Sequence, residues 1–180
     1  MTKKILGLTG PIASGKGTIK KYIEEKYGGK DCRFSTALRD ILMRIGEETS
    51  RTNMQKISTI LRQNFGQNIL SKIIAKDVKN IDSNIVVIDG IRRLTDIEYL
   101  KDLNGFILIS IQANTKIRYE RMKIRNENKG DNEKSYEEFL KDHESDSDSD
   151  VPIVMSHATK TIDNNADFQS LYKQIDKLLK

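Results

Sequence analysis

The sequence predicts an α/β fold in which helices cover both faces of a parallel sheet of about five strands. Continuous apolar runs rich in β-branched residues, such as residues 85–88, are typical of strands that are buried on both faces. These runs alternate along the chain with segments whose apolar residues recur at helical spacing. The length of 180 residues favours a single domain, which we expect to span residues 1–180.

The five expected strands lie, in chain order, at residues 5–9, 32–34, 85–88, 106–111 and 159–162. The first is followed by a glycine-rich loop and by a helix that Gly28 ends. Ser35 and Thr36 are candidate caps for a helix through Met43. A long helical region over residues 53–81 follows, which we expect Gly66 to break or bend.

The second half predicts four more helices. One should follow Gly90 and carry three inward apolar residues, Ile97, Leu100 and Leu103. Another follows Thr115, and a closing helix begins near residue 168. Residues 126–150 are strongly polar, and the capping-box pattern at residues 135–138 predicts a short helix within them.

The loop at residues 10–18, Gly-Pro-Ile-Ala-Ser-Gly-Lys-Gly-Thr, predicts a phosphate-binding site. Its glycines permit backbone angles that point successive N–H groups at an anion, and the following helix adds its positive dipole end. The residues expected to bind the nucleotide are Gly10, Ala13, Ser14, Gly15, Lys16, Gly17 and Thr18. Lys16 can reach the β- and γ-phosphates, and the hydroxyl of Thr18, rather than that of Ser14, should lie near Mg²⁺. ATP and Mg²⁺ are therefore the expected cofactors.

The order Gly-Lys-Gly-Thr, with the hydroxyl two residues after the lysine, resembles the nucleoside monophosphate kinases. Residues 7–10 (Gly-Leu-Thr-Gly) and 162–165 (Ile-Asp-Asn-Asn) also resemble dephospho-coenzyme A kinases. The resemblance implies a three-layer α/β/α P-loop fold. The helical region at about residues 35–81 is expected to form an acceptor-binding insert, which resembles neither family closely enough to name the base or sugar. The polar stretch at about residues 126–150 is long enough for a lid, and the alternative is a solvated loop.

The predicted binding site for the phosphate acceptor begins at Asp89, which ends a buried strand. Parallel α/β sheets bind their ligands at the carboxyl ends of the strands. An acid there can hold Mg²⁺, and the alternative is a turn aspartate before Gly90. The segment Asp-Gly-Ile-Arg-Arg at 89–93 resembles the Asp-Gly-Phe-Pro-Arg segment of adenylate kinases. The resemblance implies that Arg93, with Arg92 sharing the role, grips the acceptor phosphate.

Two further arginine positions match these kinases. Residues 35–39, Ser-Thr-Ala-Leu-Arg, resemble the family's Ser-Thr-Gly-Asp-Met-Leu-Arg with two residues missing, which implies that Arg39 binds the acceptor. Arg118, Arg121 and Arg125 share one helical face. Arg121 and Arg125 match an Arg-x-x-x-Arg pair at the lid, which implies that they close over the transferring phosphoryl group. The alternative in each case is an ordinary solvated side chain.

The net charge of +5 is spread along the chain, and no basic and aromatic stacking platform stands out, so a nucleic-acid partner is not expected. One cysteine and the lack of any long apolar run predict a soluble cytoplasmic protein without a membrane partner, as a monomer or homodimer.

These patterns together predict an ATP- and Mg²⁺-dependent kinase for a small nucleotide-like acceptor, foremost a (deoxy)nucleoside monophosphate. Lys16, Asp89, Arg121 and Arg125 are the expected catalytic residues, and Thr18 and Asp89 the expected metal ligands. One alternative is dephospho-coenzyme A kinase, whose hydroxyl acceptor would need a base, for which Asp40 is a candidate. The other is a regulatory protein that binds and slowly hydrolyses nucleoside triphosphate.

Overall fold

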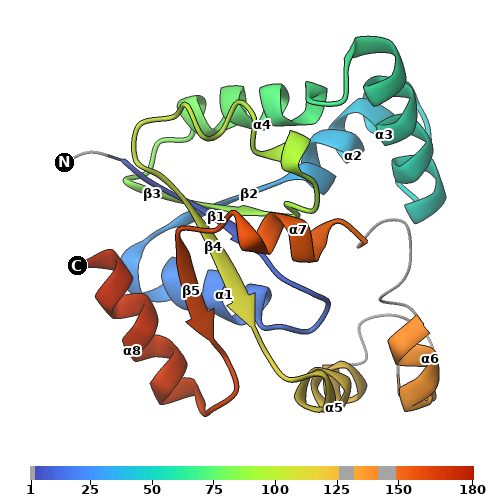
Figure 1. Cartoon of the computed structure of the whole chain (residues 1–180). Coiled ribbons are helices and arrows are strands. Elements are labelled where there is room, and N and C mark those ends of the chain that lie inside the picture. The colour runs from blue at the N-terminus through green and yellow to red at the C-terminus, as the bar shows by residue number, and fades with distance from the viewer. Residues whose placement is uncertain (1–2, 126–131, 142–148) are drawn as a thin grey trace.

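The computed structural model describes residues 3–125, 132–141 and 149–180, and its centre is a five-stranded parallel sheet (Figure 1). The strand order is β2-β3-β1-β4-β5, and every neighbouring pair is parallel. This arrangement confirms the fold class predicted from the sequence. The strands are β1 (Lys4–Thr9), β2 (Lys30–Arg33), β3 (Ile85–Asp89), β4 (Phe106–Gln112) and β5 (Lys160–Asp163).

Helices cover both faces of the sheet. In Figure 1, α1 and α8 lie on one side of the sheet, α2, α3 and α4 lie on the other, and α5 and α6 lie beyond the carboxyl end of β4. The helices are α1 (Lys16–Tyr27), α2 (Phe34–Arg44), α3 (Arg51–Phe65), α4 (Ile69–Asn80), α5 (Thr115–Arg125), α6 (Tyr136–Lys141), α7 (Val151–Ser156) and α8 (Phe168–Leu179).

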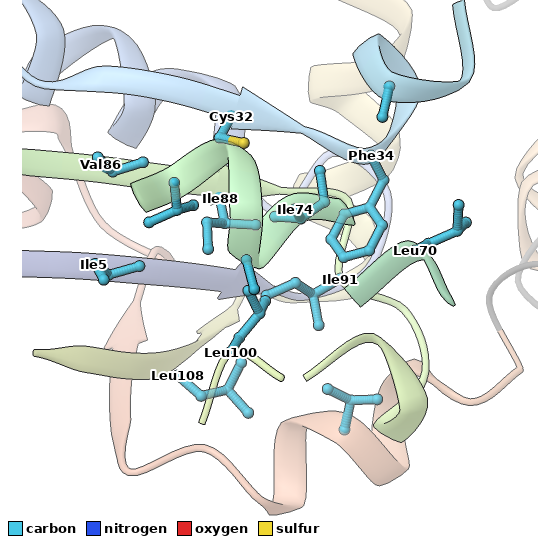
Figure 2. Close-up of a cluster of buried hydrophobic side chains, with 14 of the residues drawn as sticks. Ile5, Cys32, Phe34, Leu70, Ile74, Val86, Ile88, Ile91, Leu100 and Leu108 are labelled. Carbon is cyan, nitrogen blue, oxygen red and sulfur yellow. The ribbon is translucent and has the colours of Figure 1, made fainter. Parts of the chain in front are cut away.

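The core consists of two apolar clusters, one on each face of the sheet, because successive strand residues point to opposite faces. On β3, Val86 and Ile88 join one cluster, and Val87 joins the other. The first cluster packs β1, β3 and β4 against α2, α4 and α7 (Figure 2). The second packs the sheet against α1 and α8. Both clusters hold the carboxyl ends of the strands in fixed positions.

The prediction of a helix after Gly90 is wrong. The chain there forms only a short 3₁₀ helix, Leu94–Asp96, followed by turns. Backbone hydrogen bonds run from Ile97 to Leu94, from Leu100 to Ile97 and from Leu103 to Leu100. These bonds span three residues, so every third side chain points inward. The inward residues were therefore predicted correctly, but their spacing reflects a chain of tight turns rather than an α-helix.

Two helix starts also differ from the prediction. Helix α2 begins at Phe34 with Arg33 at its N-cap, and no side chain caps it, so Ser35 and Thr36 lie inside the first turn. Burial of Phe34, which is 6% exposed, outweighs the capping preference of the hydroxyl side chains. Helix α7 was not predicted at all, although Val151 and Val154 are both buried in it.

The capping box predicted at residues 135–138 is present. The Glu138 amide donates to Ser135 Oγ over 3.1 Å, and the Ser135 amide donates to Glu138 Oε2 over 2.8 Å. Hydrogen bonding from the backbone and the side chain of Ser135 lowers the pKa of the Glu138 carboxyl. Most of the lid predicted at 126–150 lies outside the described residues, so its role stays a prediction. No helix among the described residues has the length and apolar character needed to span a membrane.

Candidate active site

The loop between β1 and α1 can be built only with glycine at two positions. Gly10 has φ of 154°, and a Cβ there would lie 2.7 Å from the Ile111 carbonyl oxygen. Gly15 has φ of 106°, and a Cβ there would lie 2.1 Å from Asn164 Nδ2. Positive φ and close backbone approach both exclude larger residues. The loop is thus pressed against the ends of β4 and β5.

The Lys16 ammonium group lies over this loop. Its Nζ donates to the carbonyl oxygens of Gly10, at 2.6 Å, and Pro11, at 2.9 Å. Thr18 lies half-buried in the first turn of α1, and Gly17 is exposed. A cation, a helix N-terminus and a hydroxyl therefore face the same region, which is the arrangement that binds phosphate and its metal ion.

Ser14 is fully buried, and its Oγ has no hydrogen-bond partner among the described residues. Its carbonyl oxygen accepts a 2.8 Å hydrogen bond from Asn164 Nδ2. A buried hydroxyl without a partner costs free energy. A ligand oxygen in the loop would supply such a partner.

The arginines of α5 differ in their surroundings. Arg118 is 5% exposed; its Nε donates to the Ala113 carbonyl over 3.2 Å and its Nη1 to the Ile12 carbonyl over 3.3 Å. Its guanidinium also lies 5.5 Å from the centre of the Phe139 ring. Arg118 therefore joins the phosphate loop to α5 and α6. Burial lowers the pKa of Arg118 and, on the same helix, of Arg121.

Arg121 is half-buried, and Arg125 is exposed. Arg121 Nη2 lies 3.5 Å from Asn164 Oδ1, and its Nη1 is buried with no partner within the described parts of the chain. The three arginines therefore do not form one uniform face. Two of them lie near the phosphate loop: Arg118 contacts the Ile12 carbonyl directly, and Arg121 reaches the loop through Asn164.

Sequence reasoning gave no role to Asn164, which follows β5 and is 5% exposed. Its amide bridges the phosphate loop and Arg121, because Nδ2 donates to the Ser14 carbonyl while Oδ1 faces Arg121. The only signal was its place after the last strand, within the Ile-Asp-Asn-Asn run at 162–165.

Asp89 ends β3 next to the phosphate loop. Thr9 Oγ1, at the end of β1, donates to the Ile91 carbonyl over 3.2 Å and so joins the start of the loop to the segment after β3. Asp89 is also the register partner of Arg33 where β2 and β3 run side by side. Gly90 lies against Phe34 at the start of α2. The ends of β1, β2 and β3 thus meet at Asp89.

The segment after Asp89 is fixed by a side chain that sequence reasoning did not identify, Asp96. Its Oδ2 accepts hydrogen bonds of 3.0 Å from the backbone N–H groups of Arg92 and Arg93, and its Oδ1 lies 2.6 Å from Arg62 Nη2. The Arg92 side chain is exposed, whereas Arg93 is half-buried. No sequence motif marks Arg62 or Asp96.

A cavity of about 280 Å³ opens beside Arg93. It lies between the α3–α4 turn, the segment after β3 and the start of α7, and its lining residues are Gln67, Arg93, Leu94, Thr95, Asp150 and Ile153. Arg39, on α2, is half-buried and donates to Ser35 Oγ over 3.3 Å. Neither Arg39 nor the exposed Asp40 is among the residues that line this cavity.

The donor set at the loop suits Mg²⁺ with a nucleotide. Thr18 offers a hydroxyl and Asp89 a carboxylate, and Mg²⁺ is commonly held by one or two such protein oxygens together with phosphate oxygens. The buried Ser14 hydroxyl and the Lys16 ammonium fit the phosphates themselves. Within the described ranges, no cluster of three or more His, Cys, Asp or Glu could hold a metal ion by itself.

The strand order, the loop at the carboxyl end of the central strand and the helix that starts with Lys16 define a P-loop protein of the kinase-like type. A family model described as an AAA domain matches residues 6–141, well over half of the chain. The chain therefore belongs to this AAA domain family of P-loop proteins.

Relatives and solved structures are similar to the chain over nearly its whole length. A UPF0200 protein of Thermococcus kodakarensis is 26% identical, over 97% of this chain and 96% of its own. Shikimate kinase from Bacteroides thetaiotaomicron has a TM-score of 0.61 at 12% identity, covering 97% of this chain and 96% of that one. Shikimate kinase from Acinetobacter baumannii, in complex with shikimate, has a TM-score of 0.52 at 17% identity, covering 99% and 92%. At these identities the solved structures show the fold alone.

Proposed function

We propose that the protein is a Mg²⁺- and ATP-dependent small-molecule kinase whose acceptor is nucleotide-like, foremost a (deoxy)nucleoside monophosphate. The observation that carries the proposal is that one arginine lies near the phosphate loop and a second lines a cavity beside the segment that follows β3. Arg121 approaches the loop from α5, and Arg93 lines a cavity beyond Asp89. A protein that only binds and hydrolyses a nucleotide does not need the second arginine.

The donor half would hold the triphosphate of ATP. Loop N–H groups and Lys16 neutralise the β- and γ-phosphates, and Arg121 stabilises the charge that spreads over the transferring group. Thr18 and Asp89 would hold Mg²⁺, which would supply positive charge against the charge that develops on the phosphates. Arg125, on the same helix, can contribute once the lid is closed, which would also exclude water.

The acceptor half would orient the attacking oxygen. Arg93 would bind the acceptor phosphate by the bidentate hydrogen bonds that suit guanidinium groups. The sequence also predicts Arg39 and Arg92 as acceptor-binding residues. An acceptor oxygen then attacks the γ-phosphorus, the bond to the β-phosphate oxygen breaks, and ADP leaves. A monophosphate oxygen is already anionic, so this reaction needs no general base.

A hydroxyl acceptor is the second candidate. The structural neighbours include shikimate kinases, and one of them holds shikimate. The lining of the cavity also includes a carboxylate, that of Asp150. Such a group could accept the proton of a hydroxyl, as dephospho-coenzyme A or a small hydroxy acid would require. Asp40, the base considered from the sequence, does not line the cavity.

The test is ADP formation from MgATP with each acceptor supplied separately. The panel contains AMP, CMP, UMP, GMP, their deoxy forms, dTMP, dephospho-coenzyme A and shikimate. Stimulation by one or a few monophosphates is the expected result. Stimulation by dephospho-coenzyme A or shikimate alone would indicate a kinase whose acceptor is a hydroxyl group. A slow, acceptor-independent background across the whole panel would contradict the proposal and favour a regulatory P-loop protein.

A further inference from the structure

A buried ion pair lies behind the cavity. Arg62 of α3 and Asp96 of the 3₁₀ helix are 9% and 3% exposed in their side chains, and their charged atoms are 2.6 Å apart. They are separated by 34 residues in the sequence. Burying two charges is expensive, so such a pair is retained only when all its polar atoms are well bonded.

Both side chains bind the walls of the cavity. Arg62 Nη1 donates to the Gln67 carbonyl and, at 3.4 Å, to Thr95 Oγ1. The second carboxylate oxygen of Asp96 accepts from the backbone of Arg93. Gln67, Thr95 and Arg93 all line the cavity, so one ion pair fixes three of its lining residues.

We infer that Arg62 and Asp96 are a positioning pair for acceptor binding, which rests on the proposed function. The pair holds the α3–α4 turn and the Arg92–Arg93 backbone at a set distance, so that Arg93 is presented to the acceptor in one geometry. Neither side chain lines the cavity, so both act through the residues that they hold.

A purely stabilising role is the alternative. Apolar residues of similar volume often stabilise a fold as well as a buried ion pair does. The pair is instead bonded to the backbone or hydroxyl of four residues around the cavity: Gln67, Arg92, Arg93 and Thr95. This concentration of bonds on one wall favours a role in orienting that wall.

The lining also limits the class of acceptor. Arg93 provides a positive charge, whereas Asp150 and Gln67 provide acceptor oxygens, and Leu94 and Ile153 add apolar surface. A matching acceptor carries an anionic group together with hydroxyl or amino groups on a compact body. Nucleoside monophosphates have these groups.

The variants distinguish the effect of the Arg62–Asp96 ion pair from that of the hydrogen bonds that Asp96 accepts from the backbone N–H groups of Arg92 and Arg93. Asp96→Asn keeps an oxygen for the Arg92 and Arg93 N–H groups but leaves the Arg62 charge unpaired. Arg62→Met/Asp96→Asn removes both charges and retains that oxygen. Arg62→Lys keeps the charge but cannot donate to Asp96, Gln67 and Thr95 at once. The control is Lys26→Met/Asp176→Asn, which removes an ion pair of 2.8 Å between α1 and α8, at the end of α1 remote from the phosphate loop.

Steady-state kinetics with the best acceptor of the panel should show a raised acceptor KM in the double variant, roughly tenfold or more, with the KM for ATP within about twofold. Arg62→Lys should move the same parameter in the same direction. Circular dichroism melts identify any variant that fails to fold, and the folded variants then test the positioning role. An unchanged acceptor KM in folded variants, or equal changes in both KM values and in the control, would overturn the positioning role.

Calorimetric titration of AMP and CMP into the protein without ATP separates this inference from the proposed function. If the native protein transfers no phosphoryl group to any compound, the kinase proposal fails. Weaker AMP or CMP binding in the double variant alone would still support the positioning pair. Binding equal to that of the native protein, or no binding by the native protein, would overturn it.

Discussion

The two halves of the candidate site are built in different ways. The phosphate loop is one continuous segment between β1 and α1, and its main contacts come from Asn164 and Arg118, which lie just beyond β5 and β4. The acceptor half is assembled from the α3–α4 turn, the segment after β3 and the start of α7. The first half is therefore local in sequence, and the second depends on distant segments meeting.

This difference has a physical origin. Phosphate groups are alike in every nucleotide, so one loop of N–H groups, a lysine and a hydroxyl can serve any of them. An acceptor is recognised by groups that must surround it, and these come from several elements. Substitutions in the donor half should therefore impair every acceptor equally, whereas substitutions in the acceptor half should change the relative preference.

The largest effect is expected for Lys16→Ala. On the proposed function, loss of the Lys16 charge should lower kcat by about 1,000-fold for every acceptor, because this charge would act on the donor phosphates. Lys21→Ala is the matched control, since Lys21 is an exposed lysine of the same helix, whose ammonium lies 3.7 Å from the Glu25 carboxylate. ADP formation and circular dichroism measure the two variants. Full activity of folded Lys16→Ala would contradict the assignment of Lys16 to the ATP-binding site.

The next effect separates two arginines of α5. Arg121→Ala should lower kcat by about 100-fold, because its guanidinium lies beside Asn164 and the phosphate loop. Arg125→Ala should cause a smaller loss, because Arg125 is exposed. The ratio of the two kcat values at saturating ATP and acceptor is the measurement. A greater loss in Arg125→Ala would assign the main role to the lid side of the helix.

An acceptor-side change should be smaller and selective. Arg93→Ala should raise the acceptor KM by roughly tenfold and leave the KM for ATP nearly unchanged, because it removes a bidentate phosphate contact. Arg92→Ala should have less effect, since the Arg92 side chain is exposed. Kinetics with two acceptors of the panel are compared. Equal changes in the KM for ATP and for the acceptor would contradict the division into two halves.

The smallest effect concerns stability rather than activity. Hydrogen bonds from Lys26, Tyr27 and Tyr22 lower the pKa of Asp176 from 3.8 to about 2. A lowered pKa in the folded state means that the ionised form stabilises the fold above pH 3.8, and this contribution is lost as the pH falls toward about 2.

Thermal melts between these pH values test this contribution. The Tm of the native protein should fall more steeply with decreasing pH than that of Asp176→Asn, which has no carboxylate to protonate. Kinase activity at neutral pH should be the same in both, since Asp176 lies on α8, away from either half of the site. Parallel Tm curves would show that the Asp176 contacts contribute nothing measurable.

Much of this protein could be predicted from its sequence. The buried strands, the glycine-rich loop and the helix after it follow from local composition, and the structure confirms the sheet that they predict. Gly10 and Gly15 are needed for backbone reasons that a sequence can indicate. The acceptor arginines were assigned only by resemblance to known kinases, and their roles stay predictions.

Only the tertiary structure shows where Asn164, Arg62 and Asp96 lie relative to the two halves of the candidate site. Asn164 donates to the backbone carbonyl of Ser14, 150 residues away in the chain, and the side chains of Arg62 and Asp96 pair across a separation of 34 residues. Such contacts leave no periodicity and no local motif. The sequence by itself determined the strands, the loop chemistry and the inward residues, because these depend on neighbours along the chain. Packing decided which buried polar groups meet, because that depends on where folded elements come together.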